Sequence, residues 1–201
     1  MEDLGKIKSA LGIRITQTQE LVSLTQDKFI NQILVEFSIE QAKAPLSPLP
    51  INYKELKNLT STPRKLPPFN FQCAVGLLQY LVQCTRPNLS FATSYLSQFI
   101  ESSCKPHYQA VIHTLKYVSG TQHFTLTLGQ NYLNHPDSEI PGFTDSDWGG
   151  STEKKSFSGS IIYFHCALGW RAHEQKVIAL LSAEAEYNAM TESAQALAWM
   201  K

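Results

Sequence analysis

Two short acidic patterns near the end of the chain carry side chains that could bind metal ions. The segment G-F-T-D-S-D-W places Asp145 and Asp147 two apart on an expected strand, so both carboxylates project from the same face. The segment L-S-A-E-A-E-Y places Glu184 and Glu186 in the first turn of an expected helix. Carboxylates crowded around hard cations such as Mg²⁺ are typical of a two-metal site for phosphoryl transfer.

The spacing of these carboxylates leaves an alternative open. Because successive helical residues are about 100° apart, only one of Glu184 and Glu186 can point at a given site. Both could instead complement the positive end of the helix dipole, and Asp147 could be a solvated strand end. Spacing alone therefore does not decide between a metal site and surface acids.

Several basic residues near the same patterns could contact a nucleic-acid backbone. Lys154 and Lys155 lie in an expected turn, and Arg171, His173 and Lys176 follow an expected hairpin. Side chains of these types donate to phosphate oxygens. The formal net charge of the chain is zero, so any such contact depends on this local patch and not on a global field.

Other candidates have two interpretations each. His107 and His113 share one expected helix with two lysines, where they could face phosphate or belong to a solvated surface. Trp148 and Trp170 could stack on bases or pack in the core.

Length and composition indicate a globular protein. A chain of 201 residues with 43% apolar residues can bury a core as one medium domain or two small ones. The four cysteines show no C-x-x-C spacing and are expected to be reduced thiols. No apolar run reaches the length of a membrane span, and the first residues are acidic where a signal peptide is basic. We therefore expect a cytoplasmic or nuclear protein without a membrane partner.

The first half of the chain predicts a small sheet, one helix and a linker. Residues 11–16 and 21–25 read as short strands, and Thr25 can cap a helix that runs to about Phe37. Residues 44–68 hold six of the ten prolines and are expected to form an extended linker, because proline interrupts helices and central strands.

The second half predicts a helical block followed by a smaller α+β unit. Helices are expected over 71–82, from Pro87, and from Pro106 to Gly120, followed by a strand over 121–128. A strand over 140–148 and a hairpin of 157–164 with 168–171 follow. Ser182 then caps a last helix, and its expected apolar face is made of Tyr187, Met190, Ala194 and Leu197.

The order of several motifs resembles the reverse transcriptase–ribonuclease H region of copia-type retrotransposon Pol polyproteins. The resemblance covers essentially the whole chain and gains its weight from many segments in one order with similar gaps. The segments that carry it, besides the two acidic patterns and K-S-F-S-G at Lys155–Gly159, are L-G-I-R-I at Leu11–Ile15, Y-L-V-Q-C-T-R-P-N-L-S-F-A at Tyr80–Ala92, L-S-Q-F at Leu96–Phe99, H-Y-Q-A-V at His107–Val111 and L-K-Y-V-S-G-T at Leu115–Thr121.

The resemblance implies a role for two of the acidic residues. It places the first catalytic, Mg²⁺-binding aspartate of ribonuclease H on Asp145 and the catalytic glutamate on Glu186, with Asp147 and Glu184 in supporting positions. The family's third and fourth acidic residues are expected on a following strand and near a later helix, beyond Lys201. The chain is accordingly expected to hold an incomplete set and to bind Mg²⁺ weakly.

The resemblance also implies a division of the chain and an α+β fold. Residues 1–43 resemble the end of a reverse transcriptase palm, 44–68 the linker, 69–130 a helical thumb or connection, and 139–201 a truncated ribonuclease H with a mixed sheet and one helix. No adjacent Asp-Asp pair occurs in the sequence, although the family's polymerase site uses one.

Two function hypotheses follow from this resemblance. The chain is a fragment of the polyprotein without catalysis of its own, or it is a retained module that binds nucleic acid or a protein partner. An RNA–DNA hybrid is the implied nucleic-acid partner. An unpaired edge of the incomplete sheet is expected to favour self-association.

Overall fold

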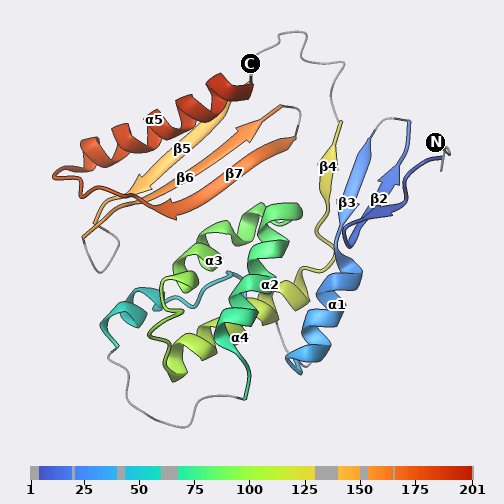
Figure 1. Cartoon of the computed structure of the whole chain (residues 1–201), viewed down its shortest axis with the longest axis horizontal. Helices are drawn as coiled ribbons and strands as arrows, with labels where there is room; N and C mark the ends of the chain where they lie inside the picture. Colours follow the sequence, from blue (N-terminus) through green and yellow to red (C-terminus); the bar gives the residue numbers. More distant parts are fainter. Residues whose placement is uncertain are drawn as a thin grey trace.

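Two antiparallel sheets flank a block of helices in the computed structural model of the chain (Figure 1). The structure describes residues 5–19, 21–39, 44–59, 68–129, 140–149, 154–164 and 166–200. Within these residues, no helix is long and apolar enough to cross a membrane.

The first sheet joins the N-terminal strands to a strand from the middle of the chain. Its order is β1-β2-β3-β4, and the strands are β1 (Ser9–Ala10), β2 (Ile13–Gln17), β3 (Val22–Thr25) and β4 (Leu126–Leu128). The predicted strand over 11–16 begins later because Leu11 and Gly12 have φ of 50° and 73°, which is turn geometry that favours glycine. The predicted strand over 121–128 is reduced to its last three residues.

The first helix, α1 (Asp27–Glu36), follows the sheet and buries one face. Ile30, Ile33 and Leu34 are buried at the spacing expected for an amphipathic helix. The prediction that Thr25 caps this helix is wrong, because the N-cap residue is Gln26 and no side chain makes a capping bond. Gln26 is instead buried, and its Oε1 accepts a hydrogen bond of 2.7 Å from Thr85 Oγ1.

The proline-rich segment packs on the helical block and is not a free linker in its described part, 44–59. It contains a 3₁₀ helix, η1 (Tyr53–Asn58), and buries Leu49 and Leu56. Side chains of the later helix α4 (Lys105–Gly120) bond to its carbonyls, through His113 to Ser47, Thr114 to Pro48 and His107 to Leu56. Residues 60–67 of the predicted linker lie outside the described residues.

The helical block follows the predictions closely. It consists of α2 (Phe71–Cys84), the 3₁₀ helix η2 (Pro87–Leu89), α3 (Ser90–Ser97) and α4. Pro87 and Pro106 open their helices as expected, and Asn70 caps α2 through a 3.1 Å bond from Cys73 N to its Oδ1. The core is formed by leucine, valine and aromatic side chains that include Leu78, Leu81, Leu96, Val111, Leu115 and Tyr95.

Two basic side chains are buried inside this block. Arg86 is 1% exposed and donates to Thr121 O, Thr121 Oγ1 and Asn88 Oδ1. His107 is also 1% exposed; its Nδ1 accepts from Cys104 N at 2.9 Å, and its Nε2 lies 3.0 Å from Leu56 O. Burial lowers the pKa of His107. His107 is therefore neither a phosphate-facing residue nor part of a solvated surface, and both interpretations were wrong.

The second sheet is built from β5 (Gly142–Asp147), β6 (Phe157–Tyr163) and β7 (Ala167–Glu174) in the order β5-β6-β7. All of its pairings are antiparallel, and the parallel strand that would make the sheet mixed is not among the described residues. One face is covered by α5 (Ser182–Met200) (Figure 1). The other packs on the helical block through Phe157 and Trp170, whose Nε1 donates to Val82 O at 2.8 Å.

Helix α5 lies on the sheet with its small residues and not with its large apolar ones. Ala185, Ala189 and Ser193 are buried, whereas Tyr187 and Met190 of the predicted apolar face are 70% and 53% exposed. Of that predicted face, only Leu197 is half-buried; a Cβ at Gly142 would lie 2.9 Å from its Cδ1. Small side chains let the helix approach this close, so the assignment of its buried face was wrong.

Candidate nucleic-acid interface

Asp145 lies in the middle of β5, on the face of the sheet that α5 does not cover. Gly142 points toward Leu197 of α5, and residues an odd number of positions away on a strand point to the opposite face. Asp147 shares the side of Asp145, because it forms an ion pair of 3.6 Å with Lys54 of η1. The prediction that Asp145 and Asp147 share a face is therefore confirmed.

Glu186 lies on α5, and hence on the other side of the sheet from Asp145. It is half-buried. Its neighbour Glu184 accepts a 2.7 Å hydrogen bond from Leu180 N and so stabilises the start of the helix, as the alternative interpretation proposed. The structure thus does not bring Asp145 and Glu186 together. Among the described residues, no group of three or more His, Cys, Asp or Glu side chains could hold a metal ion.

The predicted basic residues occupy two places on the second sheet. Lys154 is exposed and has φ of 59° in the turn before β6. The start of β6 pairs with the end of β7, and Gln175 N donates to Ser156 O at 2.8 Å. This pairing brings Lys154, Lys155 and Lys176 to the same end of the sheet.

Arg171 and His173 lie further along β7 and share one side of it. Arg171 is exposed. His173 Nε2 is 2.8 Å from Glu192 Oε2 of α5, and burial lowers the pKa of His173, although Glu192 opposes the shift. The Nε2 of His173 is therefore engaged inside the protein, whereas its buried Nδ1 has no hydrogen-bond partner among the described residues.

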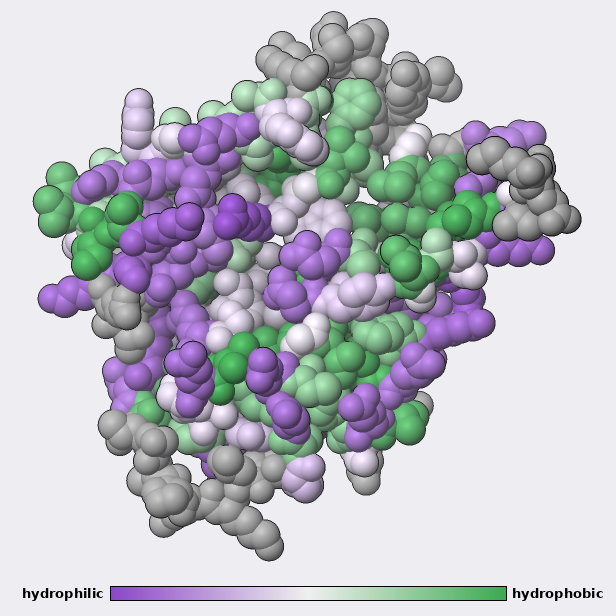
Figure 2. Space-filling model, viewed as in Figure 1, coloured by the Kyte–Doolittle hydropathy of each residue, from purple (hydrophilic) through white to green (hydrophobic). Residues whose placement is uncertain are grey.

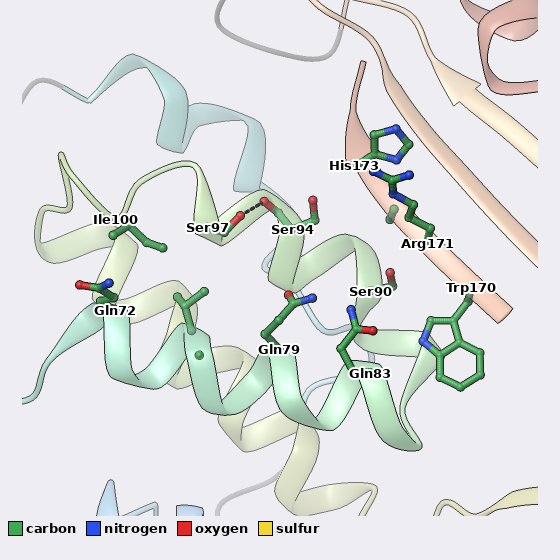
Figure 3. Close-up of a pocket in the computed structure, with 13 residues that line it drawn as sticks. Gln72, Gln79, Gln83, Ser90, Ser94, Ser97, Ile100, Trp170, Arg171 and His173 are labelled. Carbon is green, nitrogen blue, oxygen red and sulfur yellow. Dashed lines mark hydrogen bonds between the residues drawn. The ribbon is translucent and has the colours of Figure 1, made fainter. Parts of the chain in front are cut away.

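A polar groove that the sequence did not predict runs between α2, α3 and β7 (Figure 3). It encloses about 540 Å³. The wall from α2 carries Gln72, Gln79 and Gln83. Figure 3 shows Gln83 next to Trp170 of β7, Gln79 in the middle of the groove and Gln72 at its far end, near Ile100. Ser90, Ser94 and Ser97 of α3 add a row of hydroxyls. The groove therefore offers mainly neutral donors and acceptors, because the Arg171 side chain shares the α5-facing side of β7 with His173.

The spacing of these residues is the signal in the sequence from which the groove could be predicted. Gln72, Gly76, Gln79 and Gln83 recur at four, three and four residues, and the serines at four and three. Each set therefore forms a stripe on one helix face. A Cβ at Gly76 would meet nothing within 4 Å, so the stripe borders open space. Polar stripes that face a third element in this way are suited to bind a ligand with many hydroxyl and phosphate oxygens.

The two tryptophan candidates differ in exposure. Trp148 is 53% exposed, and its Nε1 donates to Ala179 O at 3.0 Å. Trp170 is partly buried against the core and borders the groove. Trp170 thus combines the two interpretations, since it packs and also lines an open space.

Comparison with known proteins identifies the family to which the chain belongs. The chain is 34% identical, over its whole length, to the retrovirus-related Pol polyprotein from transposon TNT 1-94 of Nicotiana tabacum, of which it covers 15%. It is 32% identical over 99% of its length to an uncharacterized mitochondrial protein of Arabidopsis thaliana, of which it covers 80%. The Pol polyprotein from transposon RE1 of Arabidopsis thaliana is 29% identical over the whole chain, which covers 13% of it.

The chain belongs to the copia-type retrotransposon Pol polyproteins. These relatives confirm the family resemblance seen in the motifs. No protein-family model matches the chain, and no solved structure matches it significantly. The chain spans 15% or less of the two named polyproteins. The assignment of Asp145, Glu186 and the basic residues to a site stays a prediction.

Proposed function

We propose that this part of the copia-type Pol polyprotein is a reverse transcriptase–ribonuclease H segment that holds an RNA–DNA hybrid without cutting it. In this proposal residues 69–130 act as a thumb or connection, and 139–201 as the start of a ribonuclease H unit. The order of motifs over the whole chain supports this proposal, as does the α+β architecture. The observation that carries it is the polar groove between α2, α3 and β7.

The groove can bind a nucleic-acid strand through hydrogen bonds more than through electrostatic attraction. Its glutamines and serines can bond to sugar hydroxyls and phosphate oxygens, and 2′-hydroxyls distinguish RNA from DNA at such contacts. Arg171 borders the groove, but its side chain lies on the α5-facing side of β7, so the contacts inside the groove are mainly neutral. Because the chain has a formal net charge of zero, we expect affinity to come from these contacts and a few cations.

Magnesium would be the family's metal, but the described residues do not fit a two-metal site. Such a site needs several carboxylates that straddle two ions. Asp145 lies on one side of the sheet and Glu186 on the other side, on α5. A lone carboxylate holds Mg²⁺ loosely, since this ion keeps several waters. We therefore derive no cleavage step for this chain.

A filter-binding titration with a labelled RNA–DNA hybrid tests the proposal. We expect binding whose log affinity falls with log salt with a slope of about −3, from roughly three phosphate contacts at about 0.9 per contact. Replacement of Gln79 and Gln83 by alanine should weaken hybrid binding about tenfold or more, at about 1 kcal/mol for each lost hydrogen bond. Gln195→Ala, at an exposed position of α5 outside the groove, is the matched control.

Two results would contradict the proposal. One is hybrid binding no tighter than that of an unrelated neutral protein. The other is an affinity that the paired glutamine replacement leaves unchanged. A preference for hybrid over DNA duplex that the same replacement abolishes would support contacts to the RNA strand.

A further inference from the structure

A second cavity, of about 540 Å³, lies on the side of the sheet that faces away from α5. Its volume falls within the range of about 300–1,000 Å³ typical of small-molecule sites. Two cross-strand rows of the sheet form its floor, Phe143 with Ile161 and Trp170, and Asp145 with Gly159 and Ala172. Pro87 and Phe91 of the helical block line it from the other side.

The floor of this cavity carries two aromatic side chains, Phe143 and Trp170, and is open beside Gly159. Phe143 is 61% exposed, so much of its ring is available to a ligand. A Cβ at Gly159 would meet nothing within 4 Å. The glycine therefore leaves space beside Asp145 that any other residue would fill. A flat ring could enter there and contact the aromatic row, as bases do on stacking side chains.

Asp145 gives the cavity its polarity. It is exposed, and within the described part of the chain it has no hydrogen-bond or ion-pair partner, whereas Asp147 on the same strand is paired with Lys54. A carboxylate accepts hydrogen bonds and donates none. The ligand must therefore present donors at the edge of its ring.

We propose that this cavity binds a guanine base, which stacks on the row of Phe143, Ile161 and Trp170 and places its Watson–Crick edge at Asp145. Guanine presents two adjacent donors on that edge, N1–H and the N2 amino group, which match the two carboxylate oxygens. Uracil presents one donor between two carbonyl oxygens, which the carboxylate repels. Adenine and cytosine present an amino group beside an acceptor nitrogen and should fall between the two.

The guanine has two sources, a free nucleotide or an unpaired base of a bound strand. The second source rests on the proposed function, because the cavity shares Ser90, Trp170 and Arg171 with the groove. A strand in the groove could therefore place an unpaired base in the cavity. Extruded bases are commonly recognised by stacking together with hydrogen bonds to their edges.

Calorimetric titration of the chain with GMP and UMP, in EDTA, tests the site without any metal and without a hybrid. We expect GMP to bind at least tenfold more tightly than UMP. Asp145→Asn should weaken GMP binding about tenfold and reduce the preference, because an amide offers one acceptor in place of two. Gly159→Val should abolish binding of both nucleotides by filling the floor. Asp147→Asn, outside the cavity, is the matched control and should bind as the unchanged chain does.

The proposal is overturned if GMP does not bind, if GMP and UMP bind equally, or if Asp145→Asn leaves GMP binding unchanged. A hybrid with one unpaired guanine separates the two sources. Tighter binding than that of the fully paired hybrid supports the strand as the source. Binding of GMP without this gain identifies the free nucleotide as the ligand. Since GMP binding does not require hybrid binding, the two proposals can fail separately.

Discussion

Replacement of Arg86 by methionine should destabilise the chain by about 3 kcal/mol. Arg86 is 1% exposed and makes three hydrogen bonds, of 3.2 Å to Thr121 O, 2.6 Å to Thr121 Oγ1 and 3.2 Å to Asn88 Oδ1. Each contributes about 1 kcal/mol net. Arg86 also lies where α2 and α4 both end, so the negative ends of two helix dipoles stabilise its charge.

Two further effects of this replacement oppose each other. Burial lowers the pKa of Arg86, so removal of the cation relieves a cost of burial. Methionine, however, loses the cation–π contact of the guanidinium with the Phe124 ring, whose centroid is 5.4 Å away, and such a contact contributes about 0.5–2 kcal/mol. We expect the two effects to offset each other, which leaves the three hydrogen bonds as the net loss.

Urea unfolding followed by circular dichroism measures this loss. A destabilisation of about 3 kcal/mol corresponds to a melting temperature lower by roughly 6–12 °C for a chain of this size. Arg86→Lys is the matched control for charge. Because an ammonium cannot reach three acceptors as a planar guanidinium does, it should recover less than half of the loss. A loss below 1 kcal/mol for Arg86→Met, or full recovery by lysine, would contradict the assignment of the loss to the three hydrogen bonds.

Three other outcomes are expected. The chain should show no primer extension on an RNA template, because its sequence has no adjacent Asp-Asp pair; extension above a metal-free blank would contradict this. It should self-associate in sedimentation through β5, which has no partner on its outer edge among the described strands, or through the exposed apolar side chains of Tyr187 and Trp199. Tyr187→Ser with Trp199→Ser should raise the monomer fraction if the helix face contributes, and a monodisperse unchanged chain would count against association. The free energy of unfolding should fall as pH drops below about 6.5. The pKa values of His107 and His173 are lowered in the fold, so the unfolded state binds more protons there. His107→Gln should reduce the dependence of the unfolding free energy on pH.

Exposed apolar side chains also gather where the chain enters α5. Val177, Ile178, Leu180 and Leu181 are each more than half exposed, and Figure 2 shows hydrophobic surface at the left edge, at the end of α5 where the helix begins. This segment is a second surface at which association of copies can be sought by the same sedimentation measurement.

Local signals in the sequence predicted most of the elements. Pro87 and Pro106 indicated the starts of two helices, since proline fits the first helical turn, and the structure has both. The hairpin of β6 and β7 also lies where alternation predicted it, with His165 of its turn outside the described residues. These features depend on neighbours in sequence, which is why they could be read from it.

Features that depend on distant residues were missed. The proline-rich segment looked like a linker because its hydrogen bonds go to His107, His113 and Thr114, more than fifty residues away. Helix α5 has a small-residue face and a large apolar face, and periodicity alone could not say which one meets the sheet. The same ambiguity hid the fact that α5 covers the side of β5 opposite to Asp145.

Incubation of the chain with an end-labelled RNA–DNA hybrid in Mg²⁺, with bound and cut hybrid measured in the same samples, distinguishes binding from cleavage. We expect bound hybrid, weakened by the Gln79 and Gln83 replacements, and no more cut RNA than in EDTA. Mg²⁺-dependent cleavage that Asp145→Asn abolishes would contradict this expectation, because Asp145 and Glu186 would then have to act together despite lying on different sides of the sheet.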